Sequence, residues 1–306
     1  MKVTVFTPAY NRRHLLNRLF DSLLNQTSFD FEWVVVDDGS SDHTDEFFSE
    51  LNEAEIPFPV LYYQKENGGK CSAINKGVEL AKGEWFFIVD SDDYLYPDAI
   101  ETIIEGTYGV DKDNRFGAIC YLKCLETGEC VGGEVDYETL DSDFFNYRAK
   151  LHYYGDRAEV IKTAIMKQFP FPVYDGEKFI SEATVWNRIA KKYKCRYYNK
   201  KIYKCEYQIG GLSDSSSRLF NNSPKGSMLF YKENYFNETT LLNKTIAVLM
   251  YWRFRFSTSI KGFSELRPTP SMYIFLPLYP IYLLIRYIDH KRRKNLVQKL
   301  NSSNHE

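Results

Sequence analysis

The sequence predicts an α/β fold, with a mostly parallel sheet flanked by helices and a helical extension at the C-terminal end. Strand-like and helix-like runs alternate over the first hundred residues, an order that is typical of a parallel sheet covered on both faces. One of these runs, Phe31–Asp37, contains Trp-Val-Val-Val and is typical of a strand buried on both faces. Polar clusters follow the strands at residues 8–11, 37–41 and 90–93, where ligands bind in such sheets.

Four strands and four helices are expected in the first hundred residues. The strands are Lys2–Thr7, Phe31–Asp37, Pro59–Gln64 and Trp85–Val89. Leucine and phenylalanine recur on one helical face over residues 15–24 and predict the first helix. The other helices are Thr44–Asn52, Cys71–Ala81 and one that begins near Pro97, since proline is tolerated in a first helical turn.

The pattern changes after residue 115. Phe116–Cys124 and Cys130–Val135 are expected to be strands joined by a turn at residues 126–128, and one or two more strands are expected in Arg196–Tyr207. Glu182–Lys191 predicts a helix, and Gly210–Ser217 a flexible loop that could close over a ligand. Helices are expected beyond residue 221, over Leu241–Phe256 and Met272–Leu300.

The formal net charge of −2 conceals a division of charge along the 306 residues. Residues 1–150 contain 13 Lys and Arg against 29 Asp and Glu, whereas residues 151–306 contain 26 against 12. This asymmetry predicts an acidic site in the first half and an anionic partner for the second. A hydrophobic fraction of 44% excludes global disorder. The six cysteines include no Cys-x-x-Cys pair, which indicates reduced thiols and a cytoplasmic location. The chain opens with a strand-like run, which indicates that no signal peptide is present.

Asp90-Ser91-Asp92-Asp93 follows an apolar strand and gathers three carboxylates at one edge of the sheet. Hard cations such as Mg²⁺ and Mn²⁺ prefer carboxylate oxygens together with substrate phosphates. The chain has neither a Gly-x-Gly-x-x-Gly motif after its first strand nor a P-loop, so a nucleotide would bind most simply through a divalent metal. The alternative is a solvated acidic turn.

Two further positions could bind a nucleotide base. A carboxylate of Asp37-Asp38-Gly39-Ser40 could accept the imide N–H of uracil, and Tyr10 could stack on the ring. The alternatives are an ordinary Asx turn and a packed aromatic residue in a chain with 24 tyrosines.

Four motifs in register resemble the family 2 glycosyltransferases. They are Thr7-Pro8-Ala9-Tyr10-Asn11-Arg12, Val36-Asp37-Asp38-Gly39-Ser40-Ser41-Asp42-x-Thr44, Asn67-Gly68-Gly69-Lys70 with Asn75-x-Gly77, and Asp90-Ser91-Asp92-Asp93. The resemblance covers the first hundred residues strongly and extends more weakly to about Ser217. It implies a GT-A (Rossmann-like) fold, a nucleotide-diphosphate sugar donor and a role in polysaccharide or cell-envelope assembly.

The resemblance also implies roles for the residues of these motifs. The donor, most simply a UDP-sugar, would be bound by Thr7, Pro8, Tyr10, Asn11, Asp38, Lys70, Asn75 and Asp90. Tyr10 and Asp38 would hold the base and Lys70 would lie near the donor. Asp90 and Asp92 would lie near the ribose and a Mn²⁺ or Mg²⁺ ion, with Asp93 as a further ligand, in the manner of an Asp-x-Asp motif. Residues 1–115 would bind the donor, 116–220 the acceptor, and 221–306 would form the helical, membrane-associated region.

The general base is expected in the second half of the domain. The family commonly supplies it from a Glu-Asp pair that opens a helix, and here the matching stretch has Glu182 followed by Ala183. Glu182 is the first candidate, with Asp175 and Glu177 in reserve, and the alternative is a first-turn helix carboxylate. The family implies inversion at the anomeric carbon. The chain has no Gln-x-x-Arg-Trp signature, which favours a non-processive enzyme.

Met272–Ile285 contains no charged residue and is followed by Arg286 and the basic run 291–294. It is short for a membrane span, and Pro277 and Pro280 would interrupt a helix. We expect an interfacial segment on the inner face of the cell membrane, where a glycan or lipid-linked acceptor would be met. The alternative is a core helix packed on Leu241–Phe256. The basic residues of 191–204 are interpreted as a solvated surface and not as a nucleic-acid site.

Two other functions remain open at this point. A nucleotidylyltransferase also combines an α/β sheet with a metal, but it would need a glycine-rich phosphate loop, which Pro8-Ala9-Tyr10-Asn11 lacks. A sugar-nucleotide-binding module that has lost catalysis would be consistent with Ala183.

Overall fold

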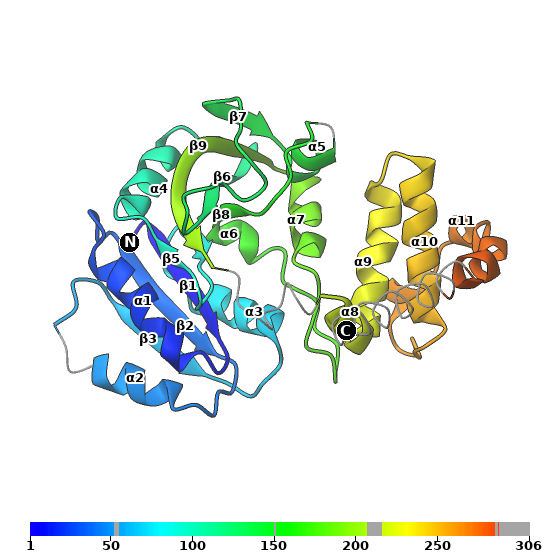
Figure 1. Ribbon diagram of the computed structural model, residues 1–306, viewed down its shortest axis with the longest axis horizontal. Helices are drawn as coiled ribbons and strands as arrows, with labels where there is room; N and C mark the ends of the chain where they lie inside the picture. The colour runs from blue at the N-terminus through cyan, green and yellow to red at the C-terminus, as the bar shows by residue number, and fades with distance from the viewer. Residues whose placement is uncertain (52–54, 150, 207–215, 285–286, 288–306) are drawn as a thin grey trace, which may run out of the picture. The chain divides into compact units, whose positions relative to one another are not determined.

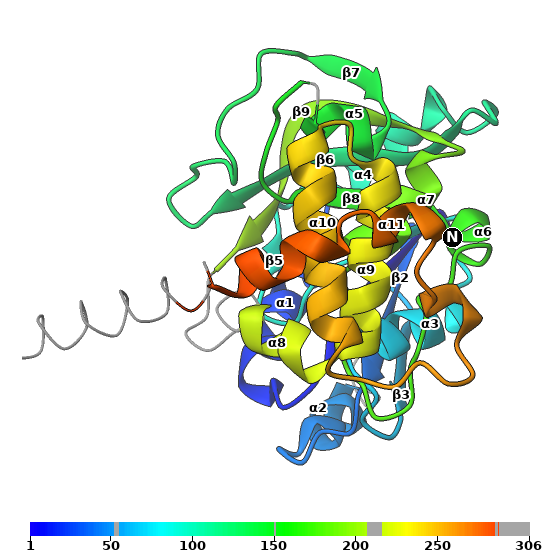
Figure 2. The same ribbon diagram turned by 90° about the vertical axis from the view of Figure 1, so that its right-hand side faces the viewer.

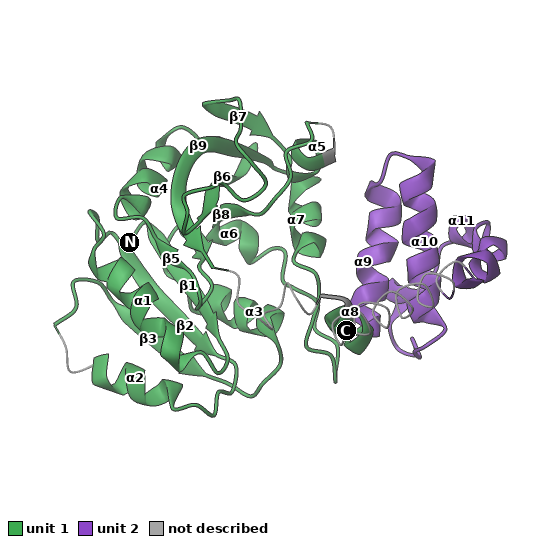
Figure 3. Ribbon diagram, in the orientation of Figure 1, with its two compact units in different colours: residues 1–223 green, residues 224–306 purple. Residues whose placement is uncertain are grey.

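The computed structural model describes residues 1–51, 55–149, 151–206, 216–284 and 287. These residues fall into two compact units, unit 1 from Met1 to Ser223 and unit 2 from Pro224 to Glu306 (Figure 3).

The first half of unit 1 is a parallel sheet, as predicted (Figure 1). The four strands are β1 (Val3–Ala9), β2 (Phe31–Asp37), β3 (Val60–Gln64) and β4 (Trp85–Ile88), and they lie in the order β3-β2-β1-β4. The connecting helices are α1 (Arg13–Leu24), α2 (Thr44–Leu51) and α3 (Lys70–Leu80). Since all four strands are parallel, the polar clusters that follow them lie at the same edge of the sheet.

The rest of the sheet is mixed in direction. It adds β8 (Arg157–Lys162), β6 (Phe116–Leu125), β9 (Lys194–Cys205) and β5 (Tyr94–Leu95) in that order beyond β4, while β7 (Thr139–Ser142) pairs with β9. β8 is antiparallel to both of its neighbours, and β9 is parallel to β6. The short polar strands β7 and β8 had no clear signal in the sequence, because their burial comes from neighbours distant in the chain.

The predicted strand Cys130–Val135 is wrong. Cys130 forms an isolated bridge with Cys124, and the chain then turns away. Gly132 and Gly133 have φ angles of 81° and 87°, a left-handed backbone that does not continue a strand. A Cβ atom on Gly132 would lie 1.9 Å from the carbonyl oxygen of Tyr154, so the turn depends on glycine there.

Helices cover the sheet and make its core. The remaining helices of unit 1 are α4 (Ala99–Tyr108), α5 (Phe144–Ala149), α6 (Thr163–Met166), α7 (Ala183–Ala190) and α8 (Ser216–Asn222). Buried leucine, isoleucine and phenylalanine side chains of α1, α2 and α4 join strand residues in one large core cluster. On the α3 side, Phe6 and Phe86 stack with ring centroids 5.1 Å apart, and Gly77 of α3 lies so close to Phe6 that a Cβ atom would clash.

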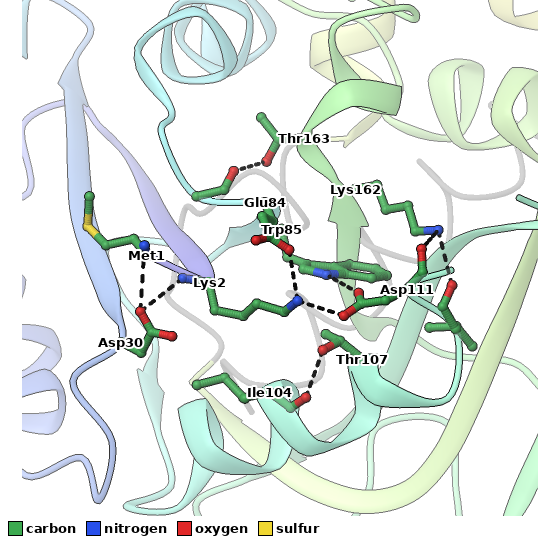
Figure 4. A network of polar contacts seen from close by, with 12 residues as sticks. Met1, Lys2, Asp30, Glu84, Trp85, Ile104, Thr107, Asp111, Lys162 and Thr163 are labelled. Atoms are coloured by element: carbon green, nitrogen blue, oxygen red, sulfur yellow. Dashed lines mark hydrogen bonds and ion pairs between the residues drawn. The ribbon is translucent and has the colours of Figure 1, made fainter. Parts of the chain in front are cut away.

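A network of polar contacts lies at the amino ends of β1 and β4, opposite the ends that carry the motifs (Figure 4). The Lys2 ammonium lies 2.8 Å from Glu84 and 2.6 Å from Asp111, and the Trp85 indole N–H donates to Asp111 over 3.0 Å. Lys162 donates to the carbonyl oxygens of residues 110, 111 and 113. The network ties β1, β4 and β8 to the turn after α4 and thereby fixes the strands whose other ends form the site.

Unit 2 is built on two helices that lie side by side, α9 (Pro224–Asn237) and α10 (Leu241–Arg255) (Figure 2). The predicted helix Leu241–Phe256 is therefore confirmed. The Tyr251 hydroxyl donates to the carbonyl oxygen of Leu266 over 2.7 Å, and the Trp252 indole N–H to that of Met272 over 3.3 Å. These buried polar groups fasten the chain that follows onto α10.

The stretch Met272–Leu300, predicted to be helical but interrupted at its prolines, is described over residues 272–284 and 287, and it is interrupted at Pro277 as predicted. The described end of unit 2 consists of the short helices η1 (Ser264–Leu266), α11 (Pro270–Tyr273) and η2 (Leu276–Leu278), followed by helical residues 279–284. Pro277 lies within η2 and has no N–H to continue a helical ladder. None of the described helices is long and apolar enough to cross a membrane. Most of the Gly210–Ser217 loop and the basic run 291–294 lie outside the described residues.

Candidate active site

The first two motifs are joined through Asn11. Its backbone N–H donates to the Ser40 hydroxyl over 2.9 Å, and its side-chain oxygen accepts from the N–H of Ser41 over 2.8 Å. The φ angle of 52° at Asn11 allows this turn, which asparagine tolerates well. Tyr10, the preceding residue, has 51% of its surface exposed and could stack on a ligand. The Thr7 hydroxyl is buried and accepts from the Trp33 indole N–H over 3.0 Å, and Pro8 is half-buried.

Asp38 joins the second motif to the third. The residue is only 4% exposed, and its carboxylate accepts from the N–H groups of Gly68 and Gly69, at 2.9 and 2.7 Å, and from the Lys65 ammonium at 2.7 Å. The two glycine N–H groups lie at the start of α3, where the helix dipole favours a negative charge. Asp38 therefore holds the turn that precedes Lys70, and one acceptor position of its Oδ2 atom carries no described partner.

Gly69 lets the third motif approach a distant segment. Its φ angle is 88°, and a Cβ atom there would lie 1.8 Å from the carbonyl oxygen of Lys178. Asn75, one turn further along α3, donates to the Phe171 carbonyl and accepts from the Phe171 N–H, both over 2.8 Å. These contacts place residues 171–182 beside α3. The Asn75 amide, predicted to bind substrate, is thus engaged with the backbone in this structure.

Lys70 is the centre of the site. Its ammonium lies 2.7 Å from a carboxylate oxygen of Asp90 and 2.9 Å from one of Glu182. Burial alone would lower the pKa of Lys70, but the two carboxylates outweigh it and raise that pKa well above its usual range. Burial would raise the pKa of Asp90, but the positive charges of Lys70 and Lys123 outweigh it and hold that pKa below its usual range. The structure thus joins three residues that are far apart in the sequence.

Glu182 immediately precedes helix α7, at its N-cap position. Ala183, the first helical residue, occupies the place where the family commonly has an aspartate. The two reserve candidates lie earlier in the same segment, Asp175 exposed and Glu177 half-buried. Glu182 is the candidate base that the structure connects to the acidic motif, because Lys70 forms ion pairs with both Glu182 and Asp90.

The acidic motif itself is held by Tyr203 of β9. The Tyr203 hydroxyl donates to Asp93 over 2.7 Å and accepts from the backbone N–H of Asp90 over 3.0 Å. The other oxygen of Asp93 accepts from the N–H of Glu206 over 3.2 Å. Burial, with the nearby charge of Asp90, raises the pKa of Asp93 to about 7. Asp93 is therefore a buried carboxyl group, and each of its two oxygens accepts a hydrogen bond.

Asp92 differs from both of its neighbours. Its side chain is half-buried and makes no hydrogen bond or ion pair with another residue of the described ranges, while the Arg18 guanidinium donates to its backbone carbonyl over 2.6 Å. Burial and the charge of Asp90 raise the pKa of Asp92. A divalent cation would satisfy such a carboxylate.

The residues fit a metal that is shared with substrate. Within the described ranges, no three His, Cys, Asp or Glu side chains gather to hold a metal ion by themselves. Mg²⁺ and Mn²⁺ are commonly held by one or two carboxylates plus substrate phosphates. Asp92 is available for that role, whereas Asp90 is paired with Lys70 and Asp93 with Tyr203.

Sequence reasoning missed the residues that shape the motif from outside it. Tyr203 and Lys123 come from β9 and β6, and Arg18 from α1. Their positions depend on strand pairing and helix packing across more than 70 residues, and no local spacing in the sequence indicated them.

Comparison with known proteins places this arrangement in context. Residues 4–115 match the model of the family described as Glycosyl transferase family 2. The chain is 41% identical over 103 residues to a chondroitin synthase of Pasteurella multocida, an alignment covering 34% of this chain and 10% of that protein. It is 28% identical over 232 residues to the GalNAc(5)-diNAcBac-PP-undecaprenol beta-1,3-glucosyltransferase of Campylobacter jejuni, covering 72% of this chain and 71% of that protein. The chain thus spans about a tenth of the length of the Pasteurella relative.

Solved structures show the same fold. Residues 1–349 of S. aureus TarS in complex with UDP-GlcNAc superpose with a TM-score of 0.60 at 21% identity, over 90% of this chain and 78% of that one. A mannosyltransferase from Pyrobaculum calidifontis in complex with GDP-Man and Mn²⁺ superposes with a TM-score of 0.54 at 17% identity, over 92% and 80%.

The nine-stranded sheet, with its acidic motif at the carboxyl edge and its likeness to these structures, defines a glycosyltransferase fold of the GT-A class. The predicted fold class is thereby confirmed. Over residues 4–115 the chain is similar to the family 2 glycosyltransferases.

Proposed function

We propose that this chain is a metal-dependent, inverting glycosyltransferase that moves one sugar per encounter from a UDP-sugar to a glycan or lipid-linked acceptor. The observation that carries the proposal is the Lys70 bridge, because it sets a candidate base, Glu182, beside the acidic motif through Asp90. The UDP-GlcNAc complex of a structural neighbour supports the choice of donor. The lack of a Gln-x-x-Arg-Trp signature supports non-processive transfer.

The donor would lie over the carboxyl ends of the parallel strands. Exposed Tyr10 would stack on the base, and the open acceptor position of Asp38 would receive its imide N–H. Asp90 would meet the ribose. A divalent metal, held by Asp92 and the diphosphate, would supply Lewis-acid stabilisation of the leaving group. In this proposal residues 1–115 bind the donor, and residues 116–220 bind the acceptor.

Transfer would proceed by direct displacement. The acceptor hydroxyl oxygen forms a bond to the anomeric carbon while the bond from that carbon to the diphosphate oxygen breaks, and its electron pair leaves with the nucleoside diphosphate. Glu182 accepts the hydroxyl proton as general base. Lys70 lies between Glu182 and Asp90 and reduces the repulsion between these two carboxylates.

Ligand-dependent thermal protection tests the proposed donor class. UDP or a UDP-sugar with Mn²⁺ is expected to raise the melting temperature, since a ligand that binds only the folded state stabilises it by about 2.7 kcal/mol at a hundredfold excess over its dissociation constant. GDP and uridine serve as the matched comparisons for base and phosphate. Protection by GDP alone would move the proposal to a GDP-sugar, and protection by no nucleoside diphosphate would contradict it.

A second candidate function is a sugar-nucleotide-binding module without turnover. Two observations favour it. Ala183 stands where an acid was expected, and the carboxylate of Glu182 is paired with the Lys70 ammonium. Release of UDP from a UDP-sugar, measured with and without Mn²⁺, separates the two. Donor protection without any metal-dependent release would identify the module.

We also propose that unit 2 places the enzyme on the cytoplasmic face of the cell membrane. Residues 272–284 have no charge, and one side of this segment packs on α10 through Met272, Tyr279 and Tyr282. Its other apolar side chains are exposed, at residues 274, 278, 281, 283 and 284. A segment that packs on the protein on one side and exposes apolar side chains on the other is suited to the membrane–water interface. Basic residues before and after it in the sequence would favour anionic lipid.

Vesicle binding tests this placement. The double variant Ile281→Asp/Leu284→Asp is expected to lose most binding to vesicles that contain phosphatidylglycerol, because two charges enter the apolar surface. Tyr108→Asp is the control, since Tyr108 is 73% exposed but belongs to unit 1. Co-sedimentation measures the bound fraction. Equal binding of the double variant and the wild type, or absence of wild-type binding, would contradict the proposal.

A further inference from the structure

Lys123 is a cation of the site region whose charge has no direct partner. It lies in β6, half-buried, opposite Tyr203 of β9, and its ammonium sits 4.2 Å from the centre of the Tyr203 ring. The ammonium makes no hydrogen bond or ion pair within the described part of the chain. Cation–π contact stabilises an ammonium only modestly, so its donor capacity remains unused.

The ring beneath Lys123 leads directly to the acidic motif. The Tyr203 hydroxyl holds both Asp93 and the backbone of Asp90. The positive charge of Lys123 also opposes the effect of burial on the pKa of both Asp90 and Asp93. The Lys123 ammonium therefore lies close to the acidic motif, over the ring of the tyrosine that holds it.

Three other cations near the motif are already paired with carboxylates. Lys70 bridges Asp90 and Glu182, Lys65 is paired with Asp38, and Arg18 is paired with Glu206 at 2.7 Å. Removing an ammonium from bulk water is costly unless an anion compensates it. Lys123 thus has the position and the unused hydrogen-bond donors to receive an anion that arrives with the substrate.

We propose that Lys123 binds the diphosphate of the nucleotide donor and stabilises it as the leaving group. The inference rests on the proposed function and adds to it a positively charged residue that lies outside the four motifs. An ammonium on a flexible stem is suited to phosphate as a compact point charge. When the bond from the anomeric carbon to the diphosphate breaks, the electron pair moves onto a phosphate oxygen, and Lys123 offsets the charge that develops there.

Calorimetric titration of the full chain with UDP and with uridine, at constant Mn²⁺, tests this inference. Lys123→Met is expected to weaken UDP binding by about 10- to 100-fold, the range for a hydrogen bond to a charged group, and to leave uridine binding unchanged. Lys123→Arg, which keeps the charge, is expected to restore most of the UDP affinity. If the Met variant does not fold, Lys123→Gln takes its place.

Lys204→Met is the matched control. Lys204 also lies over tyrosine rings, 5.4 Å from Tyr94 and 5.0 Å from Tyr96, but it follows Tyr203 on β9 and points to the opposite side of that strand. Its replacement should leave UDP affinity unchanged. Equal UDP affinity in Lys123→Met and the wild type, or equal losses for UDP and uridine, would overturn the inference while leaving the proposed function intact. A wild type that binds uridine and UDP equally would also overturn it, and one that binds no nucleotide would overturn both.

Discussion

Glu182→Gln is expected to lower kcat by about 10²- to 10⁴-fold, the usual contribution of a positioned general base. Glutamine keeps the size of the side chain but cannot accept the proton of the acceptor hydroxyl. The affinity for UDP should change little, because Lys70 retains its 2.7 Å ion pair with Asp90 when the contact to Glu182 is lost. Turnover of a UDP-sugar and calorimetric titration with UDP measure the two quantities separately.

The reserve carboxylates provide the matched controls for this variant. Asp175→Asn and Glu177→Gln change acids in the same segment, ahead of the helix that Glu182 opens. Both are expected to keep turnover within a few-fold of the wild type. Full turnover in Glu182→Gln, with loss in either control, would transfer the role of base to that residue.

Asp92→Asn is expected to reduce metal-dependent turnover by about 10²- to 10³-fold, as happens when one preorganised electrostatic group is removed from a reaction centre. The physical reason is that the Asp92 carboxylate has no partner among the other residues that the structure describes, whereas Asp90 is bound by Lys70 and Asp93 by Tyr203. The concentration of Mn²⁺ that gives half-maximal activity should rise as well. A Mn²⁺ titration after treatment with a chelator measures both effects.

Asp98→Asn controls for the loss of one negative charge near the motif. Asp98 is exposed, precedes helix α4 and makes no side-chain capping hydrogen bond, so its replacement should not alter the response to Mn²⁺. Wild-type turnover that survives complete removal of metal, or an unchanged Mn²⁺ response in Asp92→Asn, would contradict the role proposed for Asp92.

Local pattern was sufficient for the first half of the fold. The strands Val3–Ala9 and Phe31–Asp37 were predicted to within two residues, because each is an apolar run bounded by polar turns and its burial follows from its own composition. The later strand Thr139–Ser142 is short and polar, and it exists because it pairs with Arg196 and its neighbours in β9. The strand predicted for Cys130–Val135 does not form, although its first residues are apolar, because Gly132 and Gly133 adopt left-handed conformations that end the extended backbone.

The amino-acid sequence by itself determined the fold class, the four motifs and the edge of the sheet at which they gather, because parallel strands joined by helices bring their carboxyl ends together. The tertiary structure alone decided which carboxylates are available. Asp90, Asp92 and Asp93 are the same residue type within four positions, yet Lys70 pairs with the first and Tyr203 binds the third. Those partners come from other elements of the fold, so the distinction depends on packing and on charges that meet only when the chain has folded.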